Sequence, residues 1–225
     1  MTLKNKKIIV TGGPTREWID PVRFISNASS GKMGIALADA AYKRAKETIF
    51  IHGPIDRSLL AGKTYKDIQI ETTEELLNAV ISSLGPGSVL IMSAAPADYR
   101  PLNRSGTKIK KTEDNLVITL TKNPDILKSV AEKKYSGTGL KDLFVVGFAA
   151  ETDNTEKNAL IKLKSKKLDM ICLNDVTKPG AGFASDSNLI TLFFKNGTKT
   201  ELPLMSKSEA SELILDYIEK ELQKT

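Results

Sequence analysis

Short continuous runs of apolar residues alternate along the chain with segments whose apolar positions recur every three or four residues. The runs predict buried strands, because a strand that is covered on both faces is apolar throughout. In the first half they span residues 6–11, 47–52, 68–71 and 88–93. The intervening segments predict helices, the first over residues 30–46 with Met33, Leu37 and Ala41 on one face. This alternation indicates an α/β fold, a Rossmann-like doubly wound and mostly parallel sheet with helices on both faces.

The second half continues the alternation and adds antiparallel strands. Buried strands are predicted at residues 143–149 and 169–173, with a helix over residues 152–167 between them. A hairpin is predicted from residues 189–194 and 200–202. A further antiparallel pair is predicted from residues 107–110 and 115–121. This pair exceeds what a doubly wound core requires, and we expect it to serve dimerisation.

Several helix starts can be recognised from capping residues. Thr72 with Glu75, and Ser206 with Glu209, form the spacing of a capping box. Asn123 is expected to cap the helix before residue 143, with Pro124 at its first helical position. No internal repeat or linker interrupts the pattern, so residues 1–225 are expected to form a single domain.

Composition narrows the class of protein. Hydrophobic residues make up 40% and charged residues 27%, which excludes a disordered chain and is typical of a soluble globular protein. No apolar run approaches the length of a membrane span, and the basic start of the chain lacks the apolar region of a secretory signal. The single cysteine, Cys172, lies in an apolar run and is expected to be a buried, inert thiol. We therefore expect a cytoplasmic protein without a membrane partner.

The charge balance favours anionic ligands. Lys and Arg number 33 against 27 Asp and Glu, which gives a net charge of +6. Only 6% of the residues are aromatic, and no basic run is interleaved with aromatic residues, so a nucleic-acid partner is not expected. A solvated basic surface and a phosphate pocket both remain consistent with this excess.

Four unusual stretches follow predicted strands, at residues 12–34, 94–111, 147–152 and 174–183. Ligands of an open parallel sheet bind outside the carboxyl ends of its strands, so these stretches are expected to meet at one site. Ser30 and Gly31 at a helix start would leave backbone N–H groups free for an anion. The spacing is that of neither a Walker A loop nor a dinucleotide-binding G-x-G-x-x-G.

Individual charged residues in these stretches have both structural and functional interpretations. Asp98 follows a strand and could bind a ligand or only stabilise a turn. Lys108 could serve a site or only protect a strand edge. Lys162 and Lys166 share a helical face that could take a triphosphate or only face solvent. Tyr42-x-x-x-Lys46 matches the Tyr/Lys pair of short-chain dehydrogenases, although it occurs too early in the chain.

Taken together, seven segments in order resemble the phosphopantothenoylcysteine synthetase family, also called phosphopantothenate–cysteine ligase, of coenzyme A biosynthesis. They are residues 11–17 with 19–27, then 29–34, 97–101, 108–111, 122–127, 147–152 and 174–176. Bacterial members usually carry a flavin-dependent decarboxylase in front of these motifs. Because the motifs begin here at residue 11, we expect the free-standing form of the ligase.

The resemblance implies CTP-dependent ligation of 4′-phosphopantothenate with L-cysteine through an acyl-cytidylate, in a homodimer. It implies Asn27 and Lys108 as catalytic residues, and Asn27, Arg23 and Ala97 as substrate-binding residues. The implied nucleotide-binding residues are Gly13, Ser30, Gly31, Ala94, Ala95, Asp98, Lys108, Pro124, Asp125, Ile126, Leu127, Phe148, Lys162 and Lys166. Mg²⁺ is expected to be held mainly by CTP, without a dedicated protein site. The alternatives are an NAD(P)-binding Rossmann oxidoreductase and a nucleotide-binding regulatory module.

Overall fold

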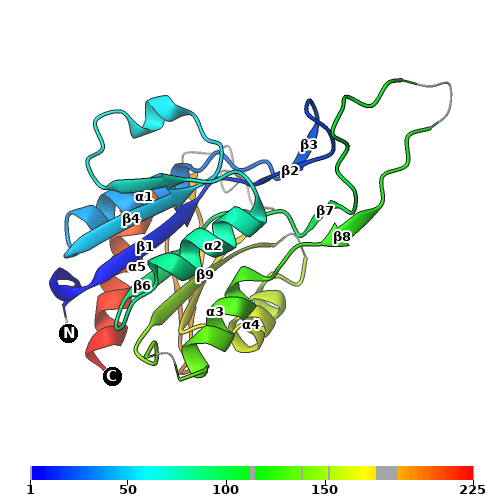
Figure 1. Ribbon diagram of the computed structural model, residues 1–225. Coiled ribbons are helices and arrows are strands. Elements are labelled where there is room, and N and C mark those ends of the chain that lie inside the picture. The colour runs from blue at the N-terminus through cyan, green and yellow to red at the C-terminus, as the bar shows by residue number, and fades with distance from the viewer. Residues whose placement is uncertain (1, 112–114, 138, 152, 176–186, 225) are drawn as a thin grey trace.

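The centre of the structure is an eight-stranded sheet (Figure 1). The structure is a computed structural model that describes residues 2–111, 115–137, 139–151, 153–175 and 187–224. Across the sheet the strands are β13 (Lys199–Glu201), β12 (Ile190–Phe194), β10 (Met170–Asp175), β9 (Phe144–Glu151), β6 (Val89–Met92), β1 (Lys7–Gly12), β4 (Glu47–His52) and β5 (Lys66–Gln69). The six strands from β5 to β10 are parallel, whereas β12 and β13 are antiparallel additions.

The order of the six parallel strands is the order of dinucleotide-binding folds. Numbered in chain order, they lie 3-2-1-4-5-6 across the sheet, so the order in which strands are added reverses between β1 and β6. This topological switch point leaves a crevice at the carboxyl ends of the two strands. The predicted Rossmann-like sheet is therefore confirmed.

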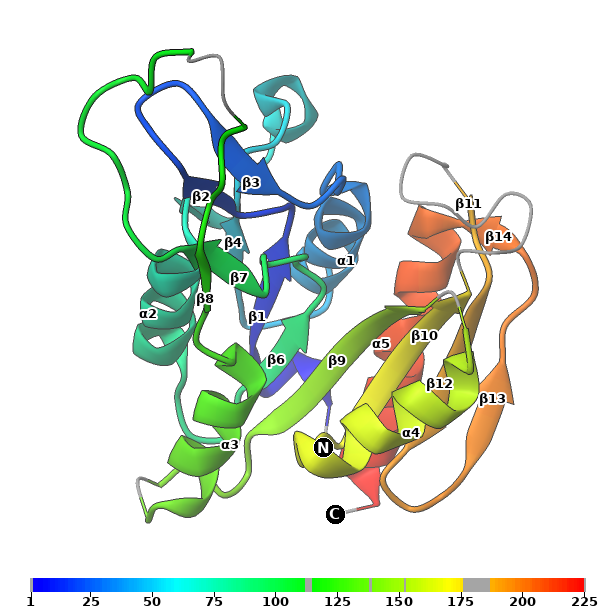
Figure 2. The same ribbon diagram turned by 90° about the vertical axis from the view of Figure 1, so that its right-hand side faces the viewer.

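Helices cover both faces of the sheet (Figures 1 and 2). They are α1 (Lys32–Tyr42), α2 (Thr73–Ser83), α3 (Ile126–Tyr135), α4 (Thr155–Ser165) and α5 (Lys207–Gln223), with short 3₁₀ turns at Leu3–Asn5 and Arg57–Leu60. Side chains of α1 and α5 form one apolar core with one face of the sheet, and side chains of α2, α3 and α4 form a second core on the other. Cys172 is fully buried in the first of these cores, as expected. No described helix has both the length and the apolar character needed to cross a membrane.

The close approach of α1 to β1 depends on Gly12 and Gly34, because neither carries a Cβ atom. A Cβ atom on Gly34 would lie 2.7 Å from the Cα atom of Gly12, which is closer than real Cβ contacts. Gly31, which precedes the helix, has a φ of +77°, a conformation that glycine adopts without strain. The start of α1 is thereby held against the end of β1, at the switch point.

Three small antiparallel pairs stand beside the sheet. They are β2 (Arg16–Trp18) with β3 (Phe24–Ser26), β7 (Tyr99–Pro101) with β8 (Leu120–Lys122), and β11 (Ser187–Asn188) with β14 (Met205–Ser206). The first two pairs, together with residues 102–111 and 115–119, extend away from the sheet (Figure 1). We call residues 16–26, 99–111 and 115–122 together the arm.

The predicted pairing of residues 107–110 with 115–121 is wrong. The chain pairs instead at the base of the arm, through β7 and β8, and residues 107–111 form no strand. Both backbone polar groups of Ile109 are engaged elsewhere: its N–H donates to Asp20 at 3.1 Å, and its carbonyl oxygen accepts from Arg23 at 2.6 Å.

Helix boundaries also differ from the sequence prediction in places. Asp125, not Asn123, caps α3, and its carboxylate accepts from the Lys128 N–H, so Pro124 precedes the helix. The first helix begins at residue 32 and ends at residue 42, and α4 is shorter at both ends than predicted. Both predicted capping boxes are confirmed.

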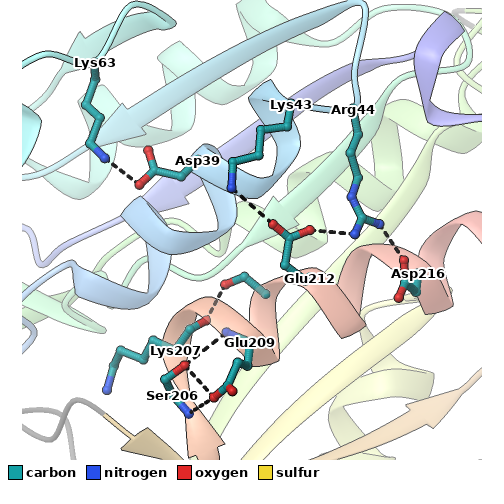
Figure 3. A network of polar contacts seen from close by, with 10 residues as sticks. Asp39, Lys43, Arg44, Lys63, Ser206, Lys207, Glu209, Glu212 and Asp216 are labelled. Atoms are coloured by element: carbon teal, nitrogen blue, oxygen red, sulfur yellow. Dashed lines mark hydrogen bonds and ion pairs between the residues drawn. The ribbon is translucent and has the colours of Figure 1, made fainter.

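The two residues that follow α1, Lys43 and Arg44, are joined to α5 by ion pairs (Figure 3). Arg44 bonds both Glu212 and Asp216, which are one helical turn apart on α5, and Lys43 adds a contact to Glu212 at 3.5 Å. Met33, in the first turn of α1, is linked through Asn188 to the first residue of α5. The two helices therefore run in the same direction, and both begin at the carboxyl edge of the sheet.

Candidate functional site

Two adjoining cavities open at the carboxyl edge of the sheet. The first, the switch-point cavity, has a volume of about 360 Å³ and lies between the start of α1 and the ends of β6, β9 and β10. The second, the α3 cavity, has a volume of about 460 Å³. It lies between the end of β6, the start of α3, and the lysines Lys162 and Lys166 at the end of α4. Five residues line both and form their junction: Ala94, Pro96, Asp98, Phe148 and Lys162. The two cavities together form one elongated site.

The wall of the switch-point cavity is a rigid backbone turn after β6. The Ala94 N–H donates to the Thr11 hydroxyl at 3.1 Å, and the Ala95 N–H donates to the carbonyl of Gly13 at 2.9 Å. The Ser93 hydroxyl donates to the carbonyl of Thr11 at 2.6 Å. The side chains at positions 94 and 95 are small and leave this backbone open to a ligand.

Asn27 lines the same cavity and lies against this turn. Its side-chain amide donates to the carbonyl oxygens of Ala95 at 3.2 Å and Pro96 at 3.0 Å. The side chain therefore bridges the segment before α1 and the segment after β6. Ser30 and Gly31, at the N-terminus of α1, line the same cavity. A helix N-terminus of this kind favours an anion.

Lys162 brings a positive charge to the junction. It projects from α4, and its ammonium group donates to the carbonyl oxygen of Phe148 at 2.8 Å. Burial lowers the pKa of Lys162 below the ordinary value for lysine, although the nearby carboxylates of Glu151 and Asp98 act in the opposite direction. An incoming phosphate would stabilise the charged form of this side chain.

The α3 cavity has an apolar and a charged side. Ala97, Pro124, Ile126 and Leu127 contribute apolar surface next to the start of α3. Asp125 and Lys166, which line the same cavity, form an ion pair. Burial would raise the pKa of Asp125, but the hydrogen bonds from Lys166 and the Lys128 N–H outweigh it and keep the pKa below its ordinary value. An apolar floor with charged edges suits a nucleoside.

A model of the protein family described as the DNA/pantothenate metabolism flavoprotein C-terminal domain matches residues 3–222. The chain belongs to this family. The resemblance drawn from the seven sequence segments is thereby confirmed at the level of the family.

The curated relatives are about twice as long as this chain. The coenzyme A biosynthesis bifunctional protein CoaBC of Bacillus subtilis (strain 168) is 43% identical over 216 residues, which cover 96% of this chain and 52% of that protein. CoaBC of Escherichia coli (strain K12) is 45% identical over 221 residues, with the same coverage of 96% and 52%. The chain therefore spans about half the length of the relatives it matches.

Solved structures of this family have the same fold. The C-terminal domain of CoaBC superposes with a TM-score of 0.78 at 37% identity, covering 99% of this chain and 98% of that one. The DNA/pantothenate metabolism flavoprotein from Streptococcus pneumoniae gives 0.75 at 25% identity, covering 96% and 99%. A Cab2 variant in complex with phosphopantothenate-cysteine gives 0.71 at 17% identity, covering 99% and 90%, and at that identity shows only the shared fold.

Three of the sequence-predicted site residues lie outside both cavities. Gly13 supports the wall through its carbonyl oxygen but does not line it. Lys108 is exposed on the arm and is not on a strand, contrary to the prediction. Arg23 is also on the arm, where its guanidinium donates to Asp20 at 2.7 Å and to the carbonyl of Ile109 at 2.6 Å. The other predicted residues meet at the two cavities.

The carboxylate of Asp20 holds the two halves of the arm together. It has no exposed surface, and it accepts hydrogen bonds from the Val22, Arg23 and Ile109 N–H groups and from the Arg23 side chain. Burial would raise the pKa of Asp20, but these bonds outweigh it and hold the pKa well below its usual range.

Sequence reasoning missed several lining residues of the switch-point cavity. Asn188 and Lys207 were not singled out, and Lys32, Glu151 and Asn174 were noted only within motifs. Lys207 comes from a helix almost at the end of the chain, and only the tertiary structure brings it to the cavity. One signal was present, because a lysine immediately after an N-cap opposes the helix dipole.

Proposed function

We propose that this chain catalyses the CTP-dependent ligation of 4′-phosphopantothenate with L-cysteine, a step of coenzyme A biosynthesis that gives 4′-phosphopantothenoylcysteine, CMP and pyrophosphate. The observation that carries the proposal is the family match over residues 3–222, joined by relatives named for coenzyme A biosynthesis at 43% and 45% identity. The chemistry of the site supports it, because Lys162 and Lys166 bring positive charge to an elongated cavity next to a helix N-terminus.

The first step forms the acyl-cytidylate. A carboxylate oxygen of 4′-phosphopantothenate attacks the α-phosphorus of CTP, the bond from that phosphorus to the bridging oxygen breaks, and pyrophosphate leaves with the electron pair. We place the nucleoside in the α3 cavity against residues 124–127, with the phosphates reaching Lys162 and the start of α1. Lys162 then stabilises the negative charge that develops at the α-phosphate.

Magnesium fits this arrangement as a companion of the nucleotide. When bound, Mg²⁺ neutralises charge on the triphosphate oxygens. The described residues contain no group of three or more His, Cys, Asp or Glu side chains that could hold a metal ion. Asp98 and Glu151 are carboxylates that line the switch-point cavity near Lys162, and either suits a supplementary ligand to an ion carried by CTP.

The second step consumes cysteine. The neutral amine of cysteine attacks the acyl carbon, the bond from that carbon to the cytidylate oxygen breaks, CMP leaves, and the amine loses a proton. Asn27 is assigned to hold the acyl-cytidylate by family resemblance. Its side chain lines the switch-point cavity, where its amide donates to the carbonyl groups of Ala95 and Pro96. Lys108 is assigned to the reaction with cysteine by family resemblance.

A homodimer accounts for the position of Lys108 and Arg23 outside the cavities. The arm that carries them exposes large apolar side chains, among them Leu102, Leu116 and Val117, the last with 84% of its surface exposed. Exposed apolar surface on a projecting segment is typical of a protein–protein contact. We propose that the arm packs on a second copy of the chain and contributes Lys108 and Arg23 to the site of that copy.

The oxidoreductase alternative has less support. Tyr42 lies at the end of α1, at the opposite edge of the sheet from the cavities, where its hydroxyl accepts from Thr64 at 2.9 Å. The turn after β1 lacks the glycine spacing that brings a dinucleotide pyrophosphate onto the helix. A purely regulatory module would bind CTP without releasing pyrophosphate.

Pyrophosphate release separates these functions. With CTP, 4′-phosphopantothenate and cysteine we expect pyrophosphate and CMP in equal amounts, and ATP in place of CTP measures nucleotide preference. Omission of cysteine should stop the reaction after about one equivalent per site. Absence of pyrophosphate with every substrate present would refute the ligase, and oxidation of NAD(P)H would favour the alternative.

Subunit complementation tests the shared site. Lys108→Gln alters the arm and Lys162→Met alters the cavity, and we expect each homodimer to be impaired. In an equal mixture of the two chains, about half of the dimers are hybrids and each hybrid has one intact site, so about a quarter of the wild-type activity should return. If the arm serves its own subunit, mixing will restore none.

A further inference from the structure

Lys207 occupies an unusual position for a lysine. It is the first residue of α5, directly after the capping residue Ser206, and only 8% of its surface is exposed. Its ammonium group donates to the Asn188 side-chain oxygen at 3.1 Å and to the carbonyl of Ser187 at 3.5 Å. A positive charge in the first turn opposes the helix dipole, and burial of a charge is costly. An anion in the adjoining cavity would offset both terms.

The geometry directs Lys207 into the switch-point cavity. Lys207 and Asn188 both line it, at a part that the α3 cavity does not share. In Figure 3 the Lys207 side chain points away from the cap formed by Ser206 and Glu209. Asn188 also donates to the sulfur of Met33 at 3.1 Å, so it ties Lys207 to the first turn of α1.

N–H donors from three separate elements therefore converge on this end of the cavity. They are the ammonium group of Lys207 on α5, the amide of Asn188 on β11, and the backbone at the start of α1 next to Ser30 and Gly31. Lys32, the first residue of α1, lines the same cavity and adds a further ammonium group. This set of donors is suited to the oxygens of a phosphate.

We infer that Lys207 and Asn188 form a second phosphate-binding position of the site, separate from Lys162. The inference rests on the proposed function, which supplies two sources of a phosphate group. One is the pair of distal phosphates of CTP, and the other is the 4′-phosphate of the pantothenate substrate. Both substrates reach the junction with their reacting groups, and each carries a phosphate that must lie some distance away from it.

Binding measurements test the position and distinguish the two sources. Calorimetric titration compares CTP with CMP, and 4′-phosphopantothenate with pantothenate, on wild-type protein and on Lys207→Gln. We expect the variant to bind one phosphorylated ligand about 10- to 100-fold more weakly, the effect of losing a charge-assisted hydrogen bond. The counterpart that lacks the phosphate should stay within about twofold. The ligand pair that responds identifies the source.

A matched control and a second variant complete the test. Lys220→Gln removes an exposed lysine of the same helix, which contacts the Tyr217 ring, and should leave all four affinities unchanged. Asn188→Asp keeps the size of the side chain but places a negative charge where the phosphate would lie, and it should reproduce the selective loss. If Lys207→Gln does not fold, Asn188→Asp alone decides.

Two results would overturn the inference: unchanged affinity for both phosphorylated ligands, or equal weakening of the ligands with and without the phosphate. These titrations require no turnover, so they separate this position from the proposed reaction. A wild-type chain that binds CTP but releases no pyrophosphate would contradict the ligase while leaving the phosphate position to be judged by the same affinities.

Discussion

Replacing Lys162 by methionine should abolish most of the activity while leaving the fold intact. The ammonium group of Lys162 donates to the carbonyl of Phe148 at 2.8 Å and stands at the junction of the two cavities. Removal of one such donor at a reacting centre costs about 2.7–4 kcal/mol, which corresponds to a loss in turnover of about 100- to 1000-fold. Methionine retains the apolar stem, so its packing against α4's neighbours is largely kept.

The stability of the same variant should change little, because two effects oppose each other. Loss of the ammonium group leaves the Phe148 carbonyl without its donor, a cost of about 1–3 kcal/mol when a group is fully buried and less here because the site is partly open. Removal of a charge whose burial lowers its pKa is favourable. We expect a net change of about 1 kcal/mol or less, or a shift in Tm of about 2–4 °C.

The assay combines pyrophosphate release with thermal unfolding. Lys164→Met is the matched control, since Lys164 is exposed on the same helix and lines neither cavity of the site. Lys164→Met should behave as wild type in both measurements. Turnover of Lys162→Met within about threefold of wild type would refute the reasoning, as would a loss of activity that merely follows a large loss of stability.

The lowered pKa of Lys162 also predicts a pH dependence. The free protein loses this charge at a lower pH than an ordinary lysine, and a bound phosphate raises the pKa again, so CTP binding takes up a proton between the two values. The affinity for CTP should therefore fall as the pH rises through the alkaline range, measured from about pH 7 to 10. Lys162→Met should lose this part of the dependence, and an identical pH profile in the variant would contradict the assignment.

Three further substitutions give distinct expectations. Asn27→Asp should slow cysteine-dependent turnover more than it weakens CTP binding, because an aspartate cannot donate to the Ala95 carbonyl and repels phosphate. Steady-state kinetics and calorimetry measure the two effects, and unchanged turnover would remove Asn27 from the site. Asp20→Asn should lower activity about tenfold or more through a loosened arm, with little change in Tm, and a variant with full activity would contradict this. In the wild-type protein, the stabilising hydrogen bonds to the Asp20 carboxylate should be lost only in acid, as the pH falls through its depressed pKa. Arg44→Met should lower stability by about 1 kcal/mol in a salt-sensitive way, measured by urea unfolding, and leave turnover unchanged.

Much of the fold could be predicted from the sequence because its signals are local. The strands of the parallel sheet are continuous apolar runs, and the capping boxes at Thr72 and Ser206 are read from four residues each. The arm could not be predicted in this way. Its pairing depends on Asp20 and Arg23 taking both backbone groups of Ile109, a contact across 86 to 89 residues of sequence.

The candidate site likewise contains residues that local sequence signals indicate and residues that only the tertiary structure brings together. Ser30 and Asp98 lie before a helix or after a strand at the carboxyl edge, so the topology of the sheet makes them neighbours. Lys162 reaches the same cavity from the last turn of α4. Lys207 reaches the cavity only because α5 packs beside α1, which no local pattern indicates. The opposite holds for Lys108: its sequence motif matches the family, but within one chain the residue lies outside both cavities.

The fate of a carboxylate oxygen tests the central claim most directly. 4′-Phosphopantothenate labelled with a heavy oxygen isotope in its carboxylate is converted with CTP and cysteine, and the products are analysed by mass spectrometry. Attack on the α-phosphorus followed by aminolysis leaves one labelled oxygen on the phosphate of CMP and one in the new amide. Label in inorganic phosphate with release of CDP would mean attack at the γ-phosphate, and unlabelled CMP would mean that no acyl-cytidylate forms; either result would contradict the account.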